Sequence, residues 1–422
     1  MATVRPFKAV RPAADLAAKV VSLPYDVMNR KEAAAMAEGN PFSFLHICRS
    51  EIDLPELEDP YDRRVYDKAR ENIHRFLAEG TFLQEEEPVF YLYRQEMEGR
   101  GQAGIVGCVS VDEYNSDVIK KHEFTRVEKE IDRINHFDVC DANTEPVFLT
   151  YRNKPELTAL MEKVMKRDSA LFDFVSGDGI RHQLWKIDQN EEIQEIRKAF
   201  DDIPFLYIAD GHHRSASACK VGMKRREENP AWTGEEEFNF FMAVIFPDDQ
   251  LRVFDYNRVL KDLNGHSTAE FLSLLEKAGF RVEKLGGESV YPERKHVFTM
   301  FLEGTWYRLT LTEERVPDDI IGSLDVSLLQ NLVLEPIFGI HDPRTDKRID
   351  FIGGIRGLKE LEHRASSDMK VAFAVYPVEI SDLFRVSDAD QVMPPKSTWF
   401  EPKLGSGLFL HLLSDNSEIE LK

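Results

Sequence analysis

Four functional side chains fall within five consecutive residues, DGHHR. They follow the apolar run PFLYIA and precede the small-residue run SASA, a pattern typical of a buried strand that turns directly into a helix. A helix start offers free backbone N–H groups and the positive end of the helix dipole, and both bind anions. The pattern predicts a phosphate site built from Asp210, Gly211, His212, His213 and Arg214.

Each residue type in this stretch suits a phosphate ligand. Gly211 lets the backbone approach a ligand closely, Arg214 presents a planar fork to phosphate oxygens, and the two histidines donate or titrate. In the alternative interpretation, Asp210 only caps the helix and the histidines lie satisfied at a surface turn. The grouping of four such side chains at a strand end favours the ligand site.

A second charge-rich stretch, KKHEFTRVEKEIDR, runs from Lys120 to Arg133. Phosphoryl transfer to an alcohol requires a base near the attacking hydroxyl, cations around the phosphates and usually Mg²⁺. The candidates for the base and the cations in this stretch are Lys121, His122, Glu123, Asp132 and Arg133. A solvated helix with charges paired across its turns is the alternative.

Near the C-terminus, MPPKSTWFEPKLGSG combines stiffening prolines with polar groups. Gly405 and Gly407 flank a serine and predict a flexible turn, so that this loop is a candidate to close over an anion. An ordinary connection is the alternative. Charges and hydroxyls come from Lys396, Ser397, Thr398 and Lys403.

The stretch GIHDPRTDKRIDFIGG has a similar density of polar residues. We expect a turn that leads into the strand IDFIGG, with His341 as a minor candidate for the site.

The elements that must position these residues alternate along the chain. Apolar spacing predicts helices at 61–80, 155–167, 190–200 and 267–280, and strands at 88–96, 104–114, 181–187, 204–210 and 238–246. This order predicts a mixed fold, α/β to α+β. A polar stretch near residue 235 predicts a boundary between region 1–235, with DGHHR, and a second mixed region 236–422 that contributes PPKST.

The composition of the chain limits the kinds of molecule that it is expected to bind. The 422 residues carry 54 Lys plus Arg against 75 Asp plus Glu, a net charge of −21. This surplus disfavours binding to nucleic acid or an anionic membrane and favours a small polar ligand. The chain has four cysteines without C-x-x-C spacing, an N-terminus without a signal-peptide core, and no apolar run long enough for a membrane span. We therefore expect a cytoplasmic protein. Motifs of metalloproteases, α/β-hydrolases and dinucleotide-binding folds are absent from the sequence.

Several motifs together resemble the domain-of-unknown-function 1015 family: RPFKAVRP, SLPYDVMNRKE, KHEFT with DR, ADGHHR and MPPKSTWFEPKLGSGL. That family is similar in its DGHHR region to the ParB/sulfiredoxin superfamily, which includes free-serine kinases. The resemblance implies a ParB/sulfiredoxin-like nucleotide-binding core in region 1–235, with ATP or ADP and Mg²⁺ as cofactors. Departures from the family pattern at Ser215–Ala218 and at DYNR concern the choice of substrate.

The resemblance implies a nucleotide-dependent kinase of free serine or a similar hydroxyl compound, with a role in serine metabolism. Glu123 is the first candidate base, Asp26 of the PYD motif the second, and His122 completes the catalytic set. The alternative is a nucleotide-binding regulator of the ParB-like type without small-molecule turnover. The sequence identifies no metal ligands and leaves the oligomeric state open, a homodimer included.

Overall fold

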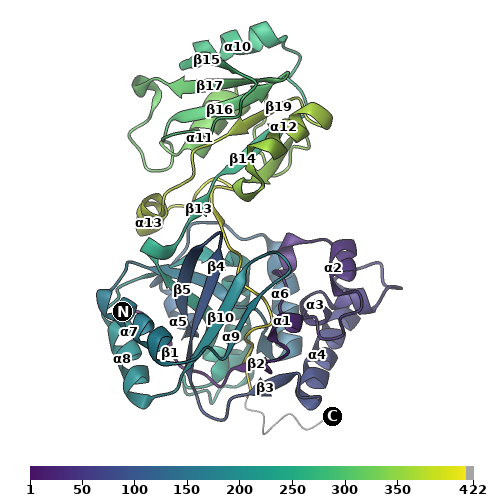
Figure 1. The fold of residues 1–422 in the computed structure, drawn as a ribbon, viewed down its shortest axis with the longest axis vertical. Coiled ribbons are helices and arrows are strands. Elements are labelled where there is room, and N and C mark those ends of the chain that lie inside the picture. The colour runs from purple at the N-terminus through teal and green to yellow at the C-terminus, as the bar shows by residue number, and fades with distance from the viewer. Residues whose placement is uncertain (415–422) are drawn as a thin grey trace. The chain divides into compact units, whose positions relative to one another are not determined.

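The structure, a computed structural model, describes residues 1–414. The chain forms two compact units: Met1–Leu251 together with the stretch from Pro402 onward make unit 1, and Arg252–Glu401 make unit 2 (Figure 1). The predicted boundary near residue 235 differs from this division. It falls before β12 (Phe240–Pro247), whose apolar residues pair with two strands of the unit 1 sheet.

Unit 1 is built on a nine-stranded mixed sheet in the order β6-β11-β8-β12-β5-β4-β10-β9, with β1 on β5. Its strands besides β12 are β1 (Val4–Arg5), β4 (Phe90–Met97), β5 (Arg100–Ser110), β6 (Ile119–Lys120), β8 (Val147–Tyr151), β9 (Phe172–Val175), β10 (Arg181–Ile187) and β11 (Leu206–Asp210). Strands β8 and β12 are almost entirely apolar because both of their faces are covered. They form the centre of the first core, which also buries one face of the flanking helices.

The longer helices of unit 1 are α4 (Arg63–Ala78), α6 (Val127–Cys140), α7 (Pro155–Arg167), α8 (Asn190–Asp201) and α9 (His212–Glu228). Their apolar residues recur at helical spacing, and Asp62 caps α4 by accepting from the backbone of Arg64. Short helices α1 (Ala17–Val20), α2 (Arg30–Ala37) and α3 (Leu45–Cys48) pack with α4 into a second core. The predicted helices at 61–80, 155–167 and 190–200 are thus confirmed.

Unit 2 contains a six-stranded antiparallel sheet in the order β15-β17-β16-β19-β14-β18. The strands are β14 (Tyr256–Leu260), β15 (Phe280–Gly286), β16 (Val297–Leu302), β17 (Thr305–Leu311), β18 (Ile349–Gly353) and β19 (Val371–Ala374). The helices α10 (Thr268–Lys277), α11 (Asp325–Leu329), α12 (Gly357–Ser367) and α13 (Ile380–Asp388) accompany it, and two-residue strands β13 (Val253–Phe254) and β20 (Trp399–Phe400) pair separately. Trp306 and Leu361 anchor a separate core.

The strand that leads into DGHHR occupies an unusual place in the unit 1 sheet. The helix α8 connects β10 to β11, but these two strands are not neighbours. Instead β11 pairs in parallel with the two-residue β6 and antiparallel with β8. The fold is therefore mixed, as predicted, rather than a doubly wound parallel sheet, and the carboxyl end of β11 brings Asp210 beside the segment that follows β6.

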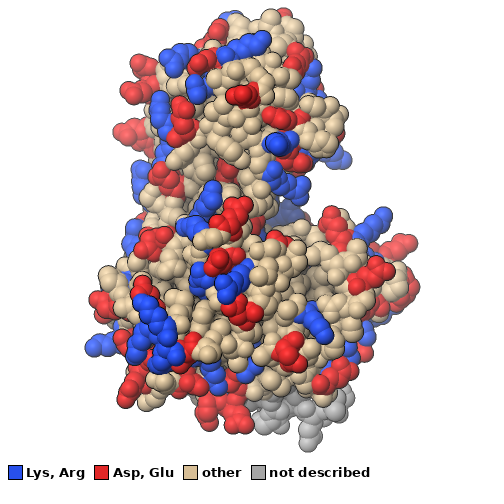
Figure 2. Space-filling view, in the orientation of Figure 1, with Lys and Arg blue, Asp and Glu red and all other residues tan. Residues whose placement is uncertain are grey.

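The surface and the cysteines add two observations. Acidic and basic side chains are interspersed on the face shown in Figure 2, so the acidic surplus forms no single field there. All four cysteines are buried with free thiols. Among the helices of residues 1–414, none has both the length and the apolar character that crossing a bilayer requires.

Candidate functional site

The junction of β11 and α9 is a tight turn from a strand directly into a helix. Gly211 lies between them with a φ of 95° and, as the N-cap residue, has no side chain to cap α9, while Asp210 Oδ1 accepts from the Gly211 N–H at 2.9 Å. A Cβ on Gly211 would lie 3.2 Å from Arg214 Nε, so both the backbone and the folded-back guanidinium require glycine here. The N-cap glycine therefore provides no side-chain acceptor for the first N–H groups of this long helix.

Asp210 closes one side of this junction as a fixed negative charge. Its Oδ2 lies 3.3 Å from Lys403 Nζ and 3.9 Å from Arg214 Nη2. Burial would raise the pKa of Asp210, but Lys403 and Arg214 outweigh it and hold the pKa well below its usual range. The carboxylate is therefore ionised at neutral pH.

Arg214 points inward rather than toward solvent. Its side chain is buried, and its Nη1 donates a hydrogen bond of 2.5 Å to the carbonyl of Pro146. Burial acts against the charge, but Asp210 and Glu145 raise the pKa of Arg214. Arg214 thus contacts both Asp210 and Pro146, the residue before β8. Its positive charge lies close to Gly211 at the helix start.

The two histidines of DGHHR fasten the KHEFT segment to the helix start. His212 Nε2 accepts from the backbone N–H of His122 at 3.4 Å, and His213 Nε2 accepts from that of Arg126 at 3.0 Å. Burial lowers the pKa of both histidines, so both are neutral. An accepting Nε2 requires the proton on Nδ1, so each ring is a hydrogen-bond donor at Nδ1.

The predicted KHEFT residues divide into buried and exposed groups. The His122 ring lies edge-on to His212 with centroids 4.5 Å apart, and burial lowers the pKa of His122 to about 4. Glu123 is 42% exposed, and its Oε2 lies 3.8 Å from His212 Nδ1. Lys121 pairs with Asp117 at 2.6 Å. Glu123 is therefore the carboxylate of this segment that a ligand at the helix start can reach.

A buried layer of charge lies behind the junction. The Arg133 guanidinium stacks on the Tyr25 ring at 3.9 Å and binds Asp132 at 2.9 Å. Glu145 Oε1 accepts from Ser406 Oγ at 2.7 Å and from the backbone N–H of Tyr25 at 3.2 Å. Burial raises the pKa of Glu145, although Arg214 and Arg133 oppose this shift.

Sequence reasoning missed Glu145 and Tyr25. A signal for Glu145 existed, because it is the one charged residue in the otherwise uncharged run ANTEPVFLTY, which leads into buried β8. Buried carboxylates without a local partner often mark functional sites. Tyr25 is next to Asp26 in the 3₁₀ turn η1 (Tyr25–Val27), and Asp26 acts electrostatically on His213, Arg214 and Glu145.

The segment that begins at Pro402 returns to unit 1 and brings Lys403 to Asp210. The expected flexible turn at Gly405–Gly407 is wrong, because Ser406 is buried and exchanges two backbone hydrogen bonds with Ser22. A Cβ on Gly405 would lie 2.8 Å from Val21, and one on Gly407 2.5 Å from Phe44. These glycines permit close packing and do not form a loop that closes.

Four predicted residues belong to unit 2. Ser397 Oγ donates to the carbonyl of Pro394, and the Lys396 carbonyl accepts from buried Arg258; Thr398 precedes β20. His341 is exposed beside Glu335 at 3.1 Å, in the turn that leads into β18 as predicted.

The carboxylates and histidines of the described residues bear on metal binding. Within residues 1–414, no group of three or more His, Cys, Asp or Glu side chains is placed to hold a metal ion. Mg²⁺ in phosphoryl-transfer sites commonly uses one or two carboxylates together with phosphate oxygens and water. The exposed carboxylate of Asp26 fits that requirement.

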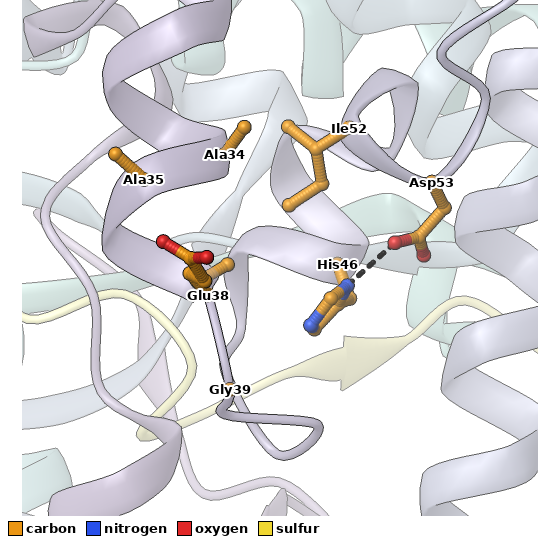
Figure 3. A pocket seen from close by; sticks show the side chains of 8 residues that line it. Ala34, Ala35, Glu38, Gly39, His46, Ile52 and Asp53 are labelled. Carbon is orange, nitrogen blue, oxygen red and sulfur yellow. Dashed lines mark hydrogen bonds and ion pairs between the residues drawn. The ribbon is translucent and has the colours of Figure 1, made fainter.

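A separate hollow of about 500 Å³ lies over α2 and α3 (Figure 3). In it, His46 Nδ1 lies 2.7 Å from Asp53 Oδ1, and its Nε2 lies 3.1 Å from the Asn40 carbonyl. Asn72 donates to the second Asp53 oxygen. Because these groups satisfy one another, we interpret this hollow as a surface groove, and it contains none of the predicted site residues.

The fold and the junction define a mixed α/β protein with buried charged side chains gathered at a helix start. The chain belongs to the family described as protein of unknown function (DUF1015), whose model matches residues 4–327. No curated protein matches the chain.

Solved structures give distant likenesses. Free serine kinase in complex with AMP is 15% identical with a TM-score of 0.35, covering 71% of this chain and 91% of that chain. A conserved hypothetical protein from Pyrococcus furiosus is 14% identical with a TM-score of 0.33, covering 71% and 94%. SbnI with C-terminal truncation from Staphylococcus aureus is 12% identical with a TM-score of 0.39, covering 73% and 87%. Similarities at this distance carry no argument about activity.

Proposed function

We propose that unit 1 has a ParB/sulfiredoxin-like core and is a nucleotide-dependent kinase that phosphorylates the hydroxyl of free serine or a similar small compound. The observation that carries the proposal is the meeting of distant segments at the start of α9. Asp26, the KHEFT segment, Glu145 and Lys403 all act on the residues of DGHHR. A helix cap alone requires none of these partners.

The nucleotide phosphates bind at the start of α9, whose N-cap residue is a glycine. The backbone N–H groups and the Nδ1–H of His213 donate to phosphate oxygens, and the Lys403 and Arg214 charges lie nearby. When bound, Mg²⁺ supplies charge neutralisation at the phosphates, with Asp26 as its protein ligand.

Glu123 is the base of this reaction. Its exposed carboxylate accepts the proton of the substrate hydroxyl while that oxygen forms a bond to the transferred phosphorus and the bond from phosphorus to the nucleotide oxygen breaks. His212 is the neighbour that fixes its position, because the Nδ1–H side of the ring faces Glu123. Asp26 is the second candidate base, and His122 is a positioning residue behind His212.

The test is direct. Purified full-length protein is incubated with Mg²⁺, with ATP, ADP or CTP, and with a panel of amino acids and small alcohols, and the products are identified by mass spectrometry. Phosphoserine or another phosphorylated alcohol, with loss of one phosphoryl group from the nucleotide, supports the kinase. Saturable nucleotide binding without any phosphorylated product favours a nucleotide-binding regulator instead.

A further inference from the structure

A small cavity of about 90 Å³ lies beside the candidate site, between α4, α6 and the 3₁₀ turn η2 (Ser50–Asp53). Tyr25 and Arg133 line it, and both also belong to the buried layer behind DGHHR. The cavity therefore shares a wall with the proposed phosphate site.

Arg133, which lines the cavity, and Glu145, which lies behind it in the buried layer, each have one buried polar atom without a hydrogen bond. Arg133 Nη1 and Glu145 Oε2 form an ion pair at 3.9 Å, beyond hydrogen-bond distance, and neither atom has a hydrogen-bond partner among residues 1–414. Buried groups without partners are rare in native proteins, because each costs the full desolvation of the group. These two atoms therefore have hydrogen-bonding capacity left for a water molecule or a ligand at the shared wall.

The cavity presents both signs of charge at short range. Glu51 accepts from Arg49 Nε through Oε1 at 2.6 Å, which leaves Oε2 to another donor. Asp132 accepts from the Tyr66 hydroxyl at 3.0 Å, and half-buried Lys129 stands on the same helix. Carboxylates suit an ammonium group, and Lys129 suits a carboxylate.

The volume limits the ligand. A cavity of about 90 Å³ takes only a small molecule. A nucleotide needs a site of several hundred Å³. The cavity is therefore too small for the phosphate donor and matches a molecule of about the size of serine.

We propose that this cavity binds the acceptor substrate, an α-amino acid in its zwitterionic form. Glu51 and Asp132 hold the ammonium group, Lys129 holds the carboxylate, and the side chain extends toward the shared wall. This inference rests on the proposed function for its chemistry, and it adds the class of acceptor and the residues that select it.

Calorimetry with the full chain and no nucleotide tests the proposal. L-serine and L-alanine should bind with similar affinity, because both are zwitterions. Ethanolamine lacks the carboxylate and 3-hydroxypropanoate lacks the ammonium group, so each should bind at least tenfold more weakly. Equal binding of all four compounds, or binding of none, would overturn the proposal.

Two variants locate the binding. Lys129→Met and Glu51→Gln should each weaken L-serine binding at least tenfold, whereas Lys166→Met, which removes a lysine from the surface of α7, should leave it unchanged. Lys129 is the safer variant because Glu51 is buried in an ion pair with Arg49. If neither Lys129→Met nor Glu51→Gln changes the affinity for L-serine, the ligand binds elsewhere and the inference is wrong.

The outcomes also separate this inference from the kinase. If amino-acid binding depends on Lys129 but no nucleotide gives a phosphorylated product, the cavity proposal stands and the kinase proposal is wrong. If serine is phosphorylated and neither Lys129→Met nor Glu51→Gln changes the KM for serine, the kinase proposal stands and the cavity proposal is wrong.

Discussion

Units 1 and 2 both bury charged side chains, but the buried charges of DGHHR in unit 1 and of DYNR in unit 2 differ in how far along the chain their partners lie. In unit 1, Lys403 reaches Asp210 over 193 positions of the chain, and Ser406 reaches Glu145 over 261. In unit 2, Asp255 binds Asn257, two positions away, and Arg258 donates both to the nearby Tyr256 carbonyl and, over 138 positions, to the Lys396 carbonyl.

The comparison separates two kinds of polar motif. A local pair forms as soon as its turn forms, whereas a long-range buried pair exists only after the whole sheet is assembled. Taking charges out of water costs free energy that stability alone does not demand. The long-range buried charge around DGHHR therefore carries a cost in free energy that an exposed local pair such as Arg344 with Asp342 does not.

The largest expected effect is an opposite response of the two units to acid. Burial lowers the pKa of His122 and His182 to about 4 and that of His136 to about 3, all in unit 1. Below pH 6.5 the unfolded state binds protons that the native state excludes, so the free energy of unfolding falls as pH drops toward 4. Each histidine contributes about 1.4 kcal/mol per pH unit.

In unit 2 we expect the free energy of unfolding to change with pH in the opposite direction. Burial raises the pKa of Asp325 to about 7, so between about pH 7 and 4 its native state binds the extra proton and gains stability on acidification. Urea titrations at pH 7.5, 6.0 and 5.0, followed by hydrogen exchange on peptides from each unit, measure both slopes. Equal slopes for the two units would contradict this contrast.

The second effect concerns turnover. Glu123→Gln retains the shape of the side chain but removes the base, so the rate of phosphorylation should fall by about 10²–10⁴ with little change in nucleotide affinity. The matched control is His341→Asn in unit 2, which should change the rate less than twofold. Full activity of Glu123→Gln with loss of activity in a folded Asp26→Asn would assign the base to Asp26.

The third effect separates the two nitrogens of His213. In His213→Gln the amide oxygen replaces Nε2 as the acceptor for Arg126 N–H, but no group replaces the Nδ1–H donor. Nucleotide affinity should fall about tenfold while hydrogen exchange of residues 121–126 stays slow. His213→Asn retains the donor and loses the acceptor, so that segment should exchange faster. If both variants had the same nucleotide affinity and the same hydrogen exchange in residues 121–126, the His213 ring would not link the nucleotide to that segment.

The smallest effect tests the backbone at the helix start. Gly211→Ala places a Cβ at a φ of 95° and near Arg214, and should lower the free energy of unfolding by about 1–2 kcal/mol. Gly287→Ala in unit 2, where the added Cβ meets no atom within 4 Å, should stay within about 0.5 kcal/mol. Chemical denaturation measures both, and a neutral Gly211→Ala would remove the argument that this turn requires glycine.

The sequence by itself determined the local elements. The period of apolar residues placed α7 and β10 at the residues predicted, and the DGHHR stretch proved to be a strand followed directly by a helix. These features depend on neighbours within a few positions, whose spacing the sequence displays. It also indicated Asp26, the KHEFT segment, DGHHR and Lys403, though as separate motifs without a common centre.

Only the tertiary structure decided which motifs meet. It brought Lys403 back to Asp210 through the stretch that begins at Pro402, and it placed Lys396, Ser397 and Thr398 in unit 2 although they lie only a few residues earlier. It also placed Glu145 in an ion pair with Arg133 and in a hydrogen bond with Ser406. No local sequence pattern predicts either contact. The physical reason is that strand order and chain crossing depend on how whole sheets bury their faces, and a side chain's burial and pKa follow from that order rather than from its neighbours in sequence.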